Sequence, residues 1–397
     1  MYGIRRSLSA GAAFALLIGA LTACGTTTSE VALTETRQPE EVAAMRLADY
    51  VVSAGDLDPK LIYGVRPKVL KPGGLTDIHG SKAIMEPIAY KNRLLFGLQD
   101  IGCAGCLFEV DPTSNWLTES DSATTMVSTA IMQFPDATSA QRAAAEFYAA
   151  DLAANRSRYH FYPANEPAHL PKYTDVKAHW RPGSPFLRTF SAHGSYVVSF
   201  VVSTPRPELD ALISLTEKAY DAQLPLLDRL KPLTEDEMRR LPVDPDNLLA
   251  KVVNPDGNTT PSADFHGVLG VRGSLLWSLD RDFAQRRFTA MKADKVAFHS
   301  TGLHQNNMVV RTSDDAAAKQ VIADRITVTP RLFDAAAPSL VPDSACVENK
   351  VRETESTDRR FTCMVAYRRY VGFAESDELA DAQQRAVAQY ALFANSQ

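Results

Sequence analysis

Residues 128–144, Ser-Thr-Ala-Ile-Met-Gln-Phe-Pro-Asp-Ala-Thr-Ser-Ala-Gln-Arg-Ala-Ala, decide the fold because a related stretch returns later in the chain. The first seven of them, residues 128–134, are typical of a buried strand. The carboxylate of Asp136 is suited to accept the first free N–H groups of a helix as its N-cap. We therefore predict a strand followed by a helix from about Ala137 to Ala154.

The later copy begins with the strand-like residues 307–312 and continues through Ser313-Asp314 into a helix from about Asp315. Apolar positions recur every three or four residues in both helices, which indicates packing on one side. Four of these positions correspond at an offset of 178: Ala140 with Ala318, Ala143 with Val321, Ala144 with Ile322, and Tyr148 with Ile326. This agreement indicates an internal repeat.

A second block repeats in the same order. Residues 185–202 predict a β-hairpin with a turn at Ala192-His193-Gly194, and a helix follows over about 208–224. The matching hairpin covers residues 361–373, and a closing helix runs over about 377–394. The order strand, helix, hairpin, helix therefore occurs twice.

The duplication predicts an α+β fold of two similar domains, each an antiparallel sheet with helices packed on one face. The joint lies in a proline-rich stretch between about Leu230 and Asp264. Because prolines interrupt regular structure, we assign residues 41–235 to an N-terminal domain and residues 236–397 to a C-terminal domain. Paired domains suggest a cleft between them, although a rigid back-to-back arrangement is equally compatible.

Residues 1–23 predict a signal peptide for secretion rather than part of the fold. Arg5 and Arg6 precede an apolar run over residues 10–21, which is too short for a permanent membrane span. The run ends in Leu21-Thr22-Ala23-Cys24, which resembles the lipobox of bacterial lipoproteins. This resemblance implies cleavage before Cys24 and attachment of lipid, including acyl chains such as palmitate, to that residue. Two or three acyl chains give stable anchoring.

Residues 24–40 are rich in Thr, Ser and Glu without apolar periodicity, so we predict a flexible tether. The chain has a net charge of −5, and loss of the two signal arginines leaves −7. A negative balance argues against a nucleic-acid partner. We predict a lipid-anchored protein on the extracytoplasmic face of the cell membrane.

Four further cysteines follow Cys24: Cys103, Cys106, Cys346 and Cys363. An even number in an exported protein indicates disulfides, and we favour the two local pairs. Cys103-Ala104-Gly105-Cys106 also has the spacing of thiol oxidoreductases, whose first cysteine lies at a helix N-terminus. The strand-like residues 107–110 do not match that position. A structural disulfide is therefore favoured over redox chemistry or a metal site.

Four common catalytic and cofactor motifs do not occur in this sequence. They are the Gly-x-Ser-x-Gly elbow, the His-Glu-x-x-His zinc motif, the Walker loop and the dinucleotide fingerprint. Residues 267–273 predict turns before a strand over 274–279. His299 and His304 are five apart, and exposed loop histidines are favoured there over a shared metal. We assign no catalytic residue, no metal ligand and no cofactor.

The densest aromatic cluster supplies the candidate ligand-binding residues. They are Tyr159, Tyr162, His179 and Trp180. Such side chains combine flat apolar area with hydrogen-bonding ends, so they suit a ligand groove or a partner surface. The alternative is a cap over the core beneath a long loop.

Several short motifs resemble those of a family of uncharacterised two-domain lipoproteins of mycolic-acid-bearing actinobacteria. In order, they are Met45-Arg46-Leu47-Ala48-Asp49-Tyr50-Val51, Asp56-Leu57-Asp58-Pro59, Ala192-His193-Gly194, Leu241-Pro242-Val243-Asp244-Pro245, Gly270-Val271-Arg272-Gly273 and Gln384-Arg385-Ala386-Val387-Ala388-Gln389-Tyr390. The resemblance implies the fold and the location but names no activity.

We predict a membrane-anchored envelope lipoprotein that binds a ligand or partner rather than an enzyme. The expected ligands or partners are a lipid, a small molecule or an envelope protein. Two alternatives remain. One is an envelope enzyme of unknown reaction, and the other is a thiol-disulfide oxidoreductase that uses Cys103 and Cys106.

Overall fold

The structure is a computed structural model. It describes residues 38–75, 82–104, 124–154, 163–301, 305–325, 332–349 and 359–396. These residues belong to one compact unit, Thr36–Gln397. The predicted signal peptide, Cys24 and most of the tether lie outside the described residues.

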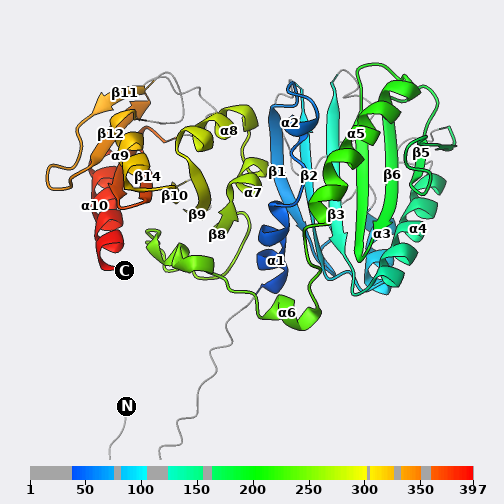
Figure 1. The fold of residues 1–397 in the computed structure, drawn as a ribbon, viewed down its shortest axis with the longest axis horizontal. Coiled ribbons are helices and arrows are strands. Elements are labelled where there is room, and N and C mark those ends of the chain that lie inside the picture. Colours follow the sequence, from blue (N-terminus) through cyan, green and yellow to red (C-terminus); the bar gives the residue numbers. More distant parts are fainter. Residues whose placement is uncertain are drawn as a thin grey trace, which may run out of the picture. The chain divides into compact units, whose positions relative to one another are not determined.

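The first domain contains a seven-stranded antiparallel sheet (Figure 1). Its strands are β1 (Tyr63–Leu70), β2 (Phe96–Cys103), β3 (Met126–Gln133), β4 (Glu166–Ala168), β5 (Lys177–Trp180), β6 (Phe186–His193) and β7 (Tyr196–Ser203), in the order β1-β2-β3-β7-β6-β5-β4. Its helices are α1 (Pro39–Ala48), α2 (Ala54–Leu57), α3 (Lys82–Lys91), α4 (Ala137–Ala153) and α5 (Leu209–Leu227), and α6 (Glu235–Arg239) follows.

The second domain repeats this sheet. Its strands are β8 (His266–Gly270), β9 (Ala293–Thr301), β10 (Gln305–Thr312), β11 (Leu332–Ala335), β12 (Ser344–Asn349), β13 (Phe361–Tyr367) and β14 (Tyr370–Ser376), in the order β8-β9-β10-β14-β13-β12-β11. Two 3₁₀ turns, η2 (Pro245–Asn247) and η3 (Leu249–Lys251), precede it. Its helices are α7 (Val271–Leu276), α8 (Arg281–Ala290), α9 (Asp315–Ala323) and α10 (Leu379–Asn395).

The predicted α+β fold of two similar antiparallel domains is confirmed. Each strand of the first sheet has a counterpart at the same place in the second, from β1 and β8 to β4 and β11. The repeated helices begin as their sequences indicate. Asp136 Oδ1 accepts the N–H of Ser139 at 2.7 Å, and Asp314 Oδ1 accepts that of Ala317 at 2.8 Å. The same N-cap therefore starts α4 and α9.

The placement of the helices differs from the prediction in one respect, because they cover both faces of each sheet. Helices α3 and α4 pack on the face that carries Met132 and Val197, whereas α1 and α5 pack on the face of Ile131 and Val198. In the second domain, α7, α8 and α9 cover one face and α10 covers the other. Strand β7 is buried along its whole length, as expected of a strand enclosed on both faces.

Helix α1 lies between the two sheets, where it contacts β2 and β8 (Figure 1). Glycines permit this approach. A Cβ on Gly267 would lie 2.1 Å from Met45 Sδ, and one on Gly270 would lie 2.3 Å from the Asp49 carboxylate. The Gly273 N–H donates to Asp49 Oδ1 at 2.8 Å. The motifs around Met45 and Gly270 therefore build the junction between the domains.

This packing overturns the prediction for residues 267–279. Strand β8 begins at His266, and residues 271–276 form helix α7, so the expected turns and the strand over 274–279 are wrong. The glycines at 267 and 270 are needed for close contact with α1, and this requirement is invisible in the local sequence pattern.

A buried ion pair also joins the domains. The Arg281 guanidinium donates from Nη1 to Asp100 Oδ2 at 2.8 Å and from Nη2 to Asp100 Oδ1 at 2.6 Å. Each side chain is only 2% exposed. Arg281 Nη2 also donates to the carbonyls of Ile101 and Leu276. Because α8 supplies Arg281 and β2 supplies Asp100, the pair ties the second domain to the first.

Each domain also contains a buried glutamine that binds its leading segment. In the first, Gln223 of α5 accepts the Val52 N–H at 2.9 Å and donates to the Tyr50 carbonyl at 2.7 Å. In the second, Gln389 of α10 makes the same two bonds, to the N–H of Val253 and the carbonyl of Lys251. The repeat therefore extends to the segments 50–52 and 251–253.

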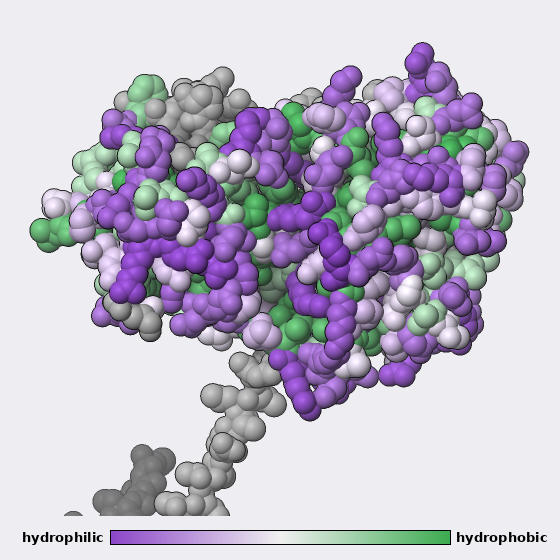
Figure 2. Space-filling view, viewed as in Figure 1, coloured by the Kyte–Doolittle hydropathy of each residue, from purple (hydrophilic) through white to green (hydrophobic). Residues whose placement is uncertain are grey.

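The surface of the two domains is mainly hydrophilic in the view of Figure 2, and apolar side chains gather where the domains meet. Within the described ranges, no helix has both the length and the apolar character needed to cross a membrane.

Candidate functional site

The aromatic cluster predicted from the sequence is only partly within the described residues. Tyr159 and Tyr162 lie outside them. His179 and Trp180 are neighbours on β5, and their side chains point to opposite faces of the sheet, as successive residues of a strand do. Trp180 packs with the α1 and α5 side, whereas the His179 ring lies 5.9 Å from the ring of Tyr148 on α4. The structure therefore does not bring these two candidates together.

His179 belongs instead to a buried charged cluster. Its Nε2 atom lies 2.9 Å from Asp151 Oδ2, and Arg188 Nη1 donates to Asp151 Oδ1 at 3.2 Å. His179 and Asp151 are each 1% exposed. The cluster joins the end of α4 to β5 and β6. Because its carboxylate is bound by a cation and an imidazole, it serves first to hold these elements together.

The cysteines occupy strand positions. Cys346 on β12 and Cys363 on β13 face each other and are joined by a disulfide, the pairing that we favoured from the sequence. Cys103 is the last residue of β2, is 1% exposed and is disulfide-bonded, and its partner lies outside the described residues. A buried strand end is not the helix N-terminus that lowers the pKa of a catalytic thiol, so this geometry does not favour the oxidoreductase alternative.

A buried polar row crosses the second sheet. His266 on β8 is directly opposite His299 on β9, and His299 is directly opposite Asn307 on β10. Side chains of directly opposite residues share one face of a sheet, so the three lie side by side. The row continues with Ala374 on β14, which is directly opposite Asn307 and carries no polar side-chain atom.

The polar atoms of this row are almost completely buried. His266 is 5% exposed, and His299 and Asn307 are 0% exposed. The two Nδ1 atoms of His266 and His299 approach to 3.1 Å. Both amide atoms of Asn307 have no hydrogen-bond partner, although other buried side chains of the described ranges leave at most one atom without a partner. Buried polar atoms are rarely left without a partner, because this costs about 1–3 kcal/mol each.

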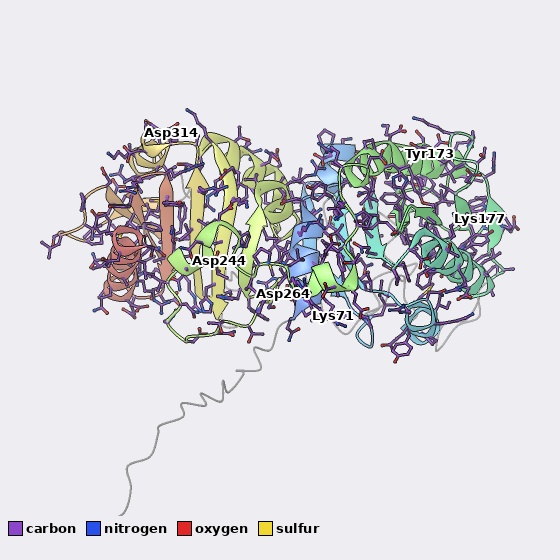
Figure 3. All side chains as sticks on the ribbon, turned by 60° about the horizontal axis from the view of Figure 1, so that its bottom comes forward. Lys71, Tyr173, Lys177, Asp244, Asp264 and Asp314 are labelled. Atoms are coloured by element: carbon purple, nitrogen blue, oxygen red, sulfur yellow. A yellow bond between two sulfur atoms is a disulfide. The ribbon has the colours of Figure 1, made fainter. Side chains whose placement is uncertain are left out.

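The loop before β8 closes the row from outside. Asp256 Oδ1 lies 2.8 Å from His299 Nε2, close enough for an ion pair although out of line for a hydrogen bond. Asp244, which is labelled in Figure 3, lies earlier in the segment between the domains and accepts the N–H groups of Leu249 and Ala250.

The surroundings of His266, and above all its burial, favour the neutral imidazole at pH 7. Burial lowers the pKa of His266 most, and the neighbouring His299 lowers it further, against the opposing effect of Asp256 and Asp244. The Asp256 carboxylate lies against His299 Nε2, so Nδ1 is the ring nitrogen of His299 that faces His266. The neutral imidazole of His266 and the Nδ1 atom of His299 therefore face each other.

The duplication explains why this position is polar. The offset of 178 places Thr129 at Asn307, and the residues opposite them are Asp100 and His299. In the first domain, the polar side chain at this position, Asp100, pairs with Arg281 of the second domain. In the second domain, the corresponding residue His299 contacts His266 and Asp256 instead.

The prediction of exposed loop histidines is wrong for His299, which is fully buried on strand β9. The local sequence pointed to His304, five residues away, as its neighbour. The true neighbour is His266, which lies 33 residues earlier and is brought there by strand pairing. His304 lies outside the described residues. The signal that could have found the pair is a histidine at the start of the apolar segment 266–270, had that segment been recognised as a strand.

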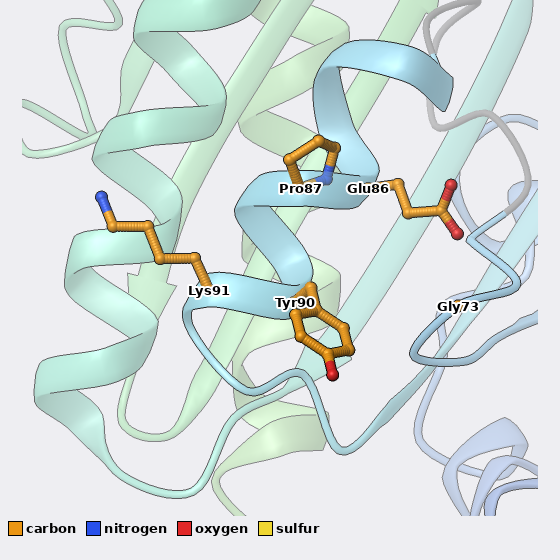
Figure 4. A pocket seen from close by; sticks show the side chains of 5 residues that line it. All are labelled: Gly73, Glu86, Pro87, Tyr90 and Lys91. Atoms are coloured by element: carbon orange, nitrogen blue, oxygen red, sulfur yellow. The ribbon is translucent and has the colours of Figure 1, made fainter.

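A second candidate is a shallow open hollow of about 450 Å³ beside α3, lined by Gly73, Glu86, Pro87, Tyr90 and Lys91 (Figure 4). Tyr90 is 72% exposed. Glu86 and Tyr90 lie on the side of α3 toward the Gly73 turn, and Lys91 points away to pair with Glu146. An open hollow with exposed side chains suits a surface contact better than an enclosed ligand.

The fold and the polar row define a two-domain α+β protein with a buried polar site in its second domain. A family model described as the N-terminal part of a domain of unknown function, DUF7373, matches residues 33–243. The model of the C-terminal part matches residues 248–396. The chain belongs to this family, and its resemblance to an uncharacterised two-domain family is confirmed.

Other comparisons are more distant. No curated protein sequence matches the chain. Among solved structures, the extracellular domain of PknH from Mycobacterium tuberculosis is similar with a TM-score of 0.33 and 11% identity, over 47% of this chain and 97% of that chain. At this TM-score the likeness supports no statement about function.

Proposed function

We propose that the protein is a lipid-anchored, extracytoplasmic binding protein of the cell envelope, and that its ligand occupies the polar row of the second domain. The observation that carries the binding role is the fully buried Asn307, whose two amide atoms have no hydrogen-bond partner among the described residues and lie next to the His266–His299 pair. A ligand that bonds to these atoms would offset the cost of burying them.

The anchor is supported by the lipobox that ends at Cys24 and by the polar tether that follows it. The disulfide between Cys346 and Cys363 supports the same location, because disulfides persist mainly in oxidising compartments outside the cytoplasm.

Replacing Cys24 with Ala is expected to abolish incorporation of a clickable palmitate analogue and to release the protein from the membrane fraction. Lipid is attached through this residue, and a tether alone has no apolar surface to hold a membrane. Cell fractionation with an immunoblot measures the release, and Cys24→Ala must be compared with Thr27→Ala in the tether. Membrane retention of Cys24→Ala with unchanged labelling would reject the anchor.

Native mass spectrometry of the chain from Gly25 onward, which keeps the whole compact unit, tests the binding role. We expect added mass on the native protein that disappears on denaturation, and loss of that mass in Asn307→Leu. The exposed Asn395→Leu on α10 is the matched control. A wild-type chain without bound mass, even after exposure to envelope extract, would reject a ligand at this site.

A further inference from the structure

We propose that His266 and His299 bind a divalent transition-metal ion of the zinc type, with Asn307 as an oxygen ligand. The inference names the ligand class of the proposed binding site, so it rests on the binding part of the proposed function and not on the anchor. Groups of three or more His, Cys, Asp or Glu that could hold a metal are absent from the described ranges. The donor set proposed here is two imidazoles and one amide.

The first argument is the convergence of two ring nitrogens. The Nδ1 atoms of His266 and His299 are 3.1 Å apart, and the rings are nearly perpendicular at 81°. Zinc binds imidazole nitrogen at about 2.0–2.1 Å with tetrahedral angles, which separates two ligand nitrogens by about 3.3 Å. A small rotation of either ring therefore opens the pair to a shared ion.

The second argument is the carboxylate behind one ligand. A metal-binding histidine usually has its other ring nitrogen beside a carboxylate, which fixes the tautomer and makes the ligand more basic. Asp256 Oδ1 lies 2.8 Å from His299 Nε2, on the far side of the ring from the shared point. The other ring nitrogen of His299, Nδ1, faces His266 and would bind the ion.

The third argument is Asn307. It is fully buried on the strand next to His299, and its Oδ1 and Nδ2 atoms have no partner among the described residues. An amide oxygen at this position would supply a third ligand. Ala374, on the other side of Asn307, adds no bulk, so a water molecule could complete the coordination.

The charges near the site favour a cation. The Asp256 carboxylate, 2.8 Å from His299 Nε2, supplies a negative charge beside the histidine pair. Imidazole ligands suit Zn²⁺, Cu²⁺ and Ni²⁺, whereas Ca²⁺ and Mg²⁺ take oxygen ligands. Each Nδ1 must be unprotonated to bind the ion, so a proton on either of them leaves to solvent or moves to Nε2 of the same ring.

Isothermal titration of the chain from Gly25 onward with ZnCl₂ tests the proposal. We expect one Zn²⁺ per chain and no binding of Ca²⁺. His266→Gln should weaken Zn²⁺ binding at least 10-fold. Asp256→Asn, at a partly exposed loop position that should not disturb folding, should weaken it about 10-fold through the neighbouring ring.

His193→Gln is the matched control, because His193 also lies 2.7 Å from a carboxylate, that of Asp228, but has no second histidine beside it. Its Zn²⁺ affinity should equal that of the wild type. Absence of stoichiometric Zn²⁺ binding, or equal binding by His266→Gln, overturns the metal proposal. If native mass spectrometry then shows an organic ligand that Asn307→Leu removes, the binding function stands and only the metal is rejected.

Discussion

Replacing Arg281 with Met is expected to lower the free energy of unfolding by about 3–5 kcal/mol, because the Asp100 carboxylate is left buried without its partner. Both side chains are 2% exposed, so water cannot take the place of the guanidinium. Two of the four hydrogen bonds that would be lost are to the carbonyls of Ile101 and Leu276. Urea unfolding followed by circular dichroism measures the change.

The matched control is Arg286→Met on the same helix. Arg286 pairs with Asp282 one turn earlier, but both side chains are more than half exposed. Exposed pairs of this kind contribute less than about 1 kcal/mol, so the control should unfold almost as the wild type does. An equal effect of Arg281→Met and Arg286→Met would show that the buried pair does not stabilise the junction between the domains.

A double variant separates the loss of the pair from the burial of one charge. With Asp100→Leu added to Arg281→Met, neither charge is buried, and most of the lost stability should return. If the double variant is as unstable as Arg281→Met alone, the cost comes from lost packing and not from the unpaired carboxylate.

The repeated elements could be predicted because their signals are local. The N-cap Asp136 and the apolar stripe that follows it occur within a few turns of helix, and the second copy at Asp314 strengthens both. The turn of the first hairpin at Gly194 is equally local, since its backbone has a positive φ of 56° that glycine adopts readily. Such features need no knowledge of distant residues.

The junction and the polar row could not be predicted, because they depend on contacts between distant segments. Arg281 and Asp100 are 181 residues apart, and nothing in the residues around either one indicates the other. Gly270 resembles a turn glycine until Asp49, from the first domain, occupies the space of its missing side chain. The helices on both faces were missed for a similar reason, since an apolar stripe indicates burial but not the face that it covers.

The adjacent candidates His179 and Trp180 illustrate a further limit of prediction from sequence. Their neighbouring positions predicted one aromatic cluster. Successive side chains of a strand point to opposite faces of the sheet, so the two are separated. The same alternation, applied across β8, β9 and β10, brings His266, His299 and Asn307 together. Register therefore decides both outcomes, and it is set by the whole sheet.

Replacing Gln389 with Met is expected to lower the free energy of unfolding by about 2–4 kcal/mol. Met fills a similar volume, but it leaves the Val253 N–H and the Lys251 carbonyl buried without a partner, at about 1–3 kcal/mol each. Gln223→Met should have an effect of similar size, because Gln223 makes the same two bonds to Val52 and Tyr50. Urea unfolding measures both variants.

Gln383→Met provides the control on α10, since Gln383 is only partly buried and its one bond, to the carbonyl of Ala336, is exposed. It should change stability by less than about 0.5 kcal/mol. Because each glutamine binds the leading segment of its own domain, the duplication predicts that Gln389→Met and Gln223→Met are both destabilised. A large loss in Gln389→Met with none in Gln223→Met would show that the shared geometry is not a shared stabilising device.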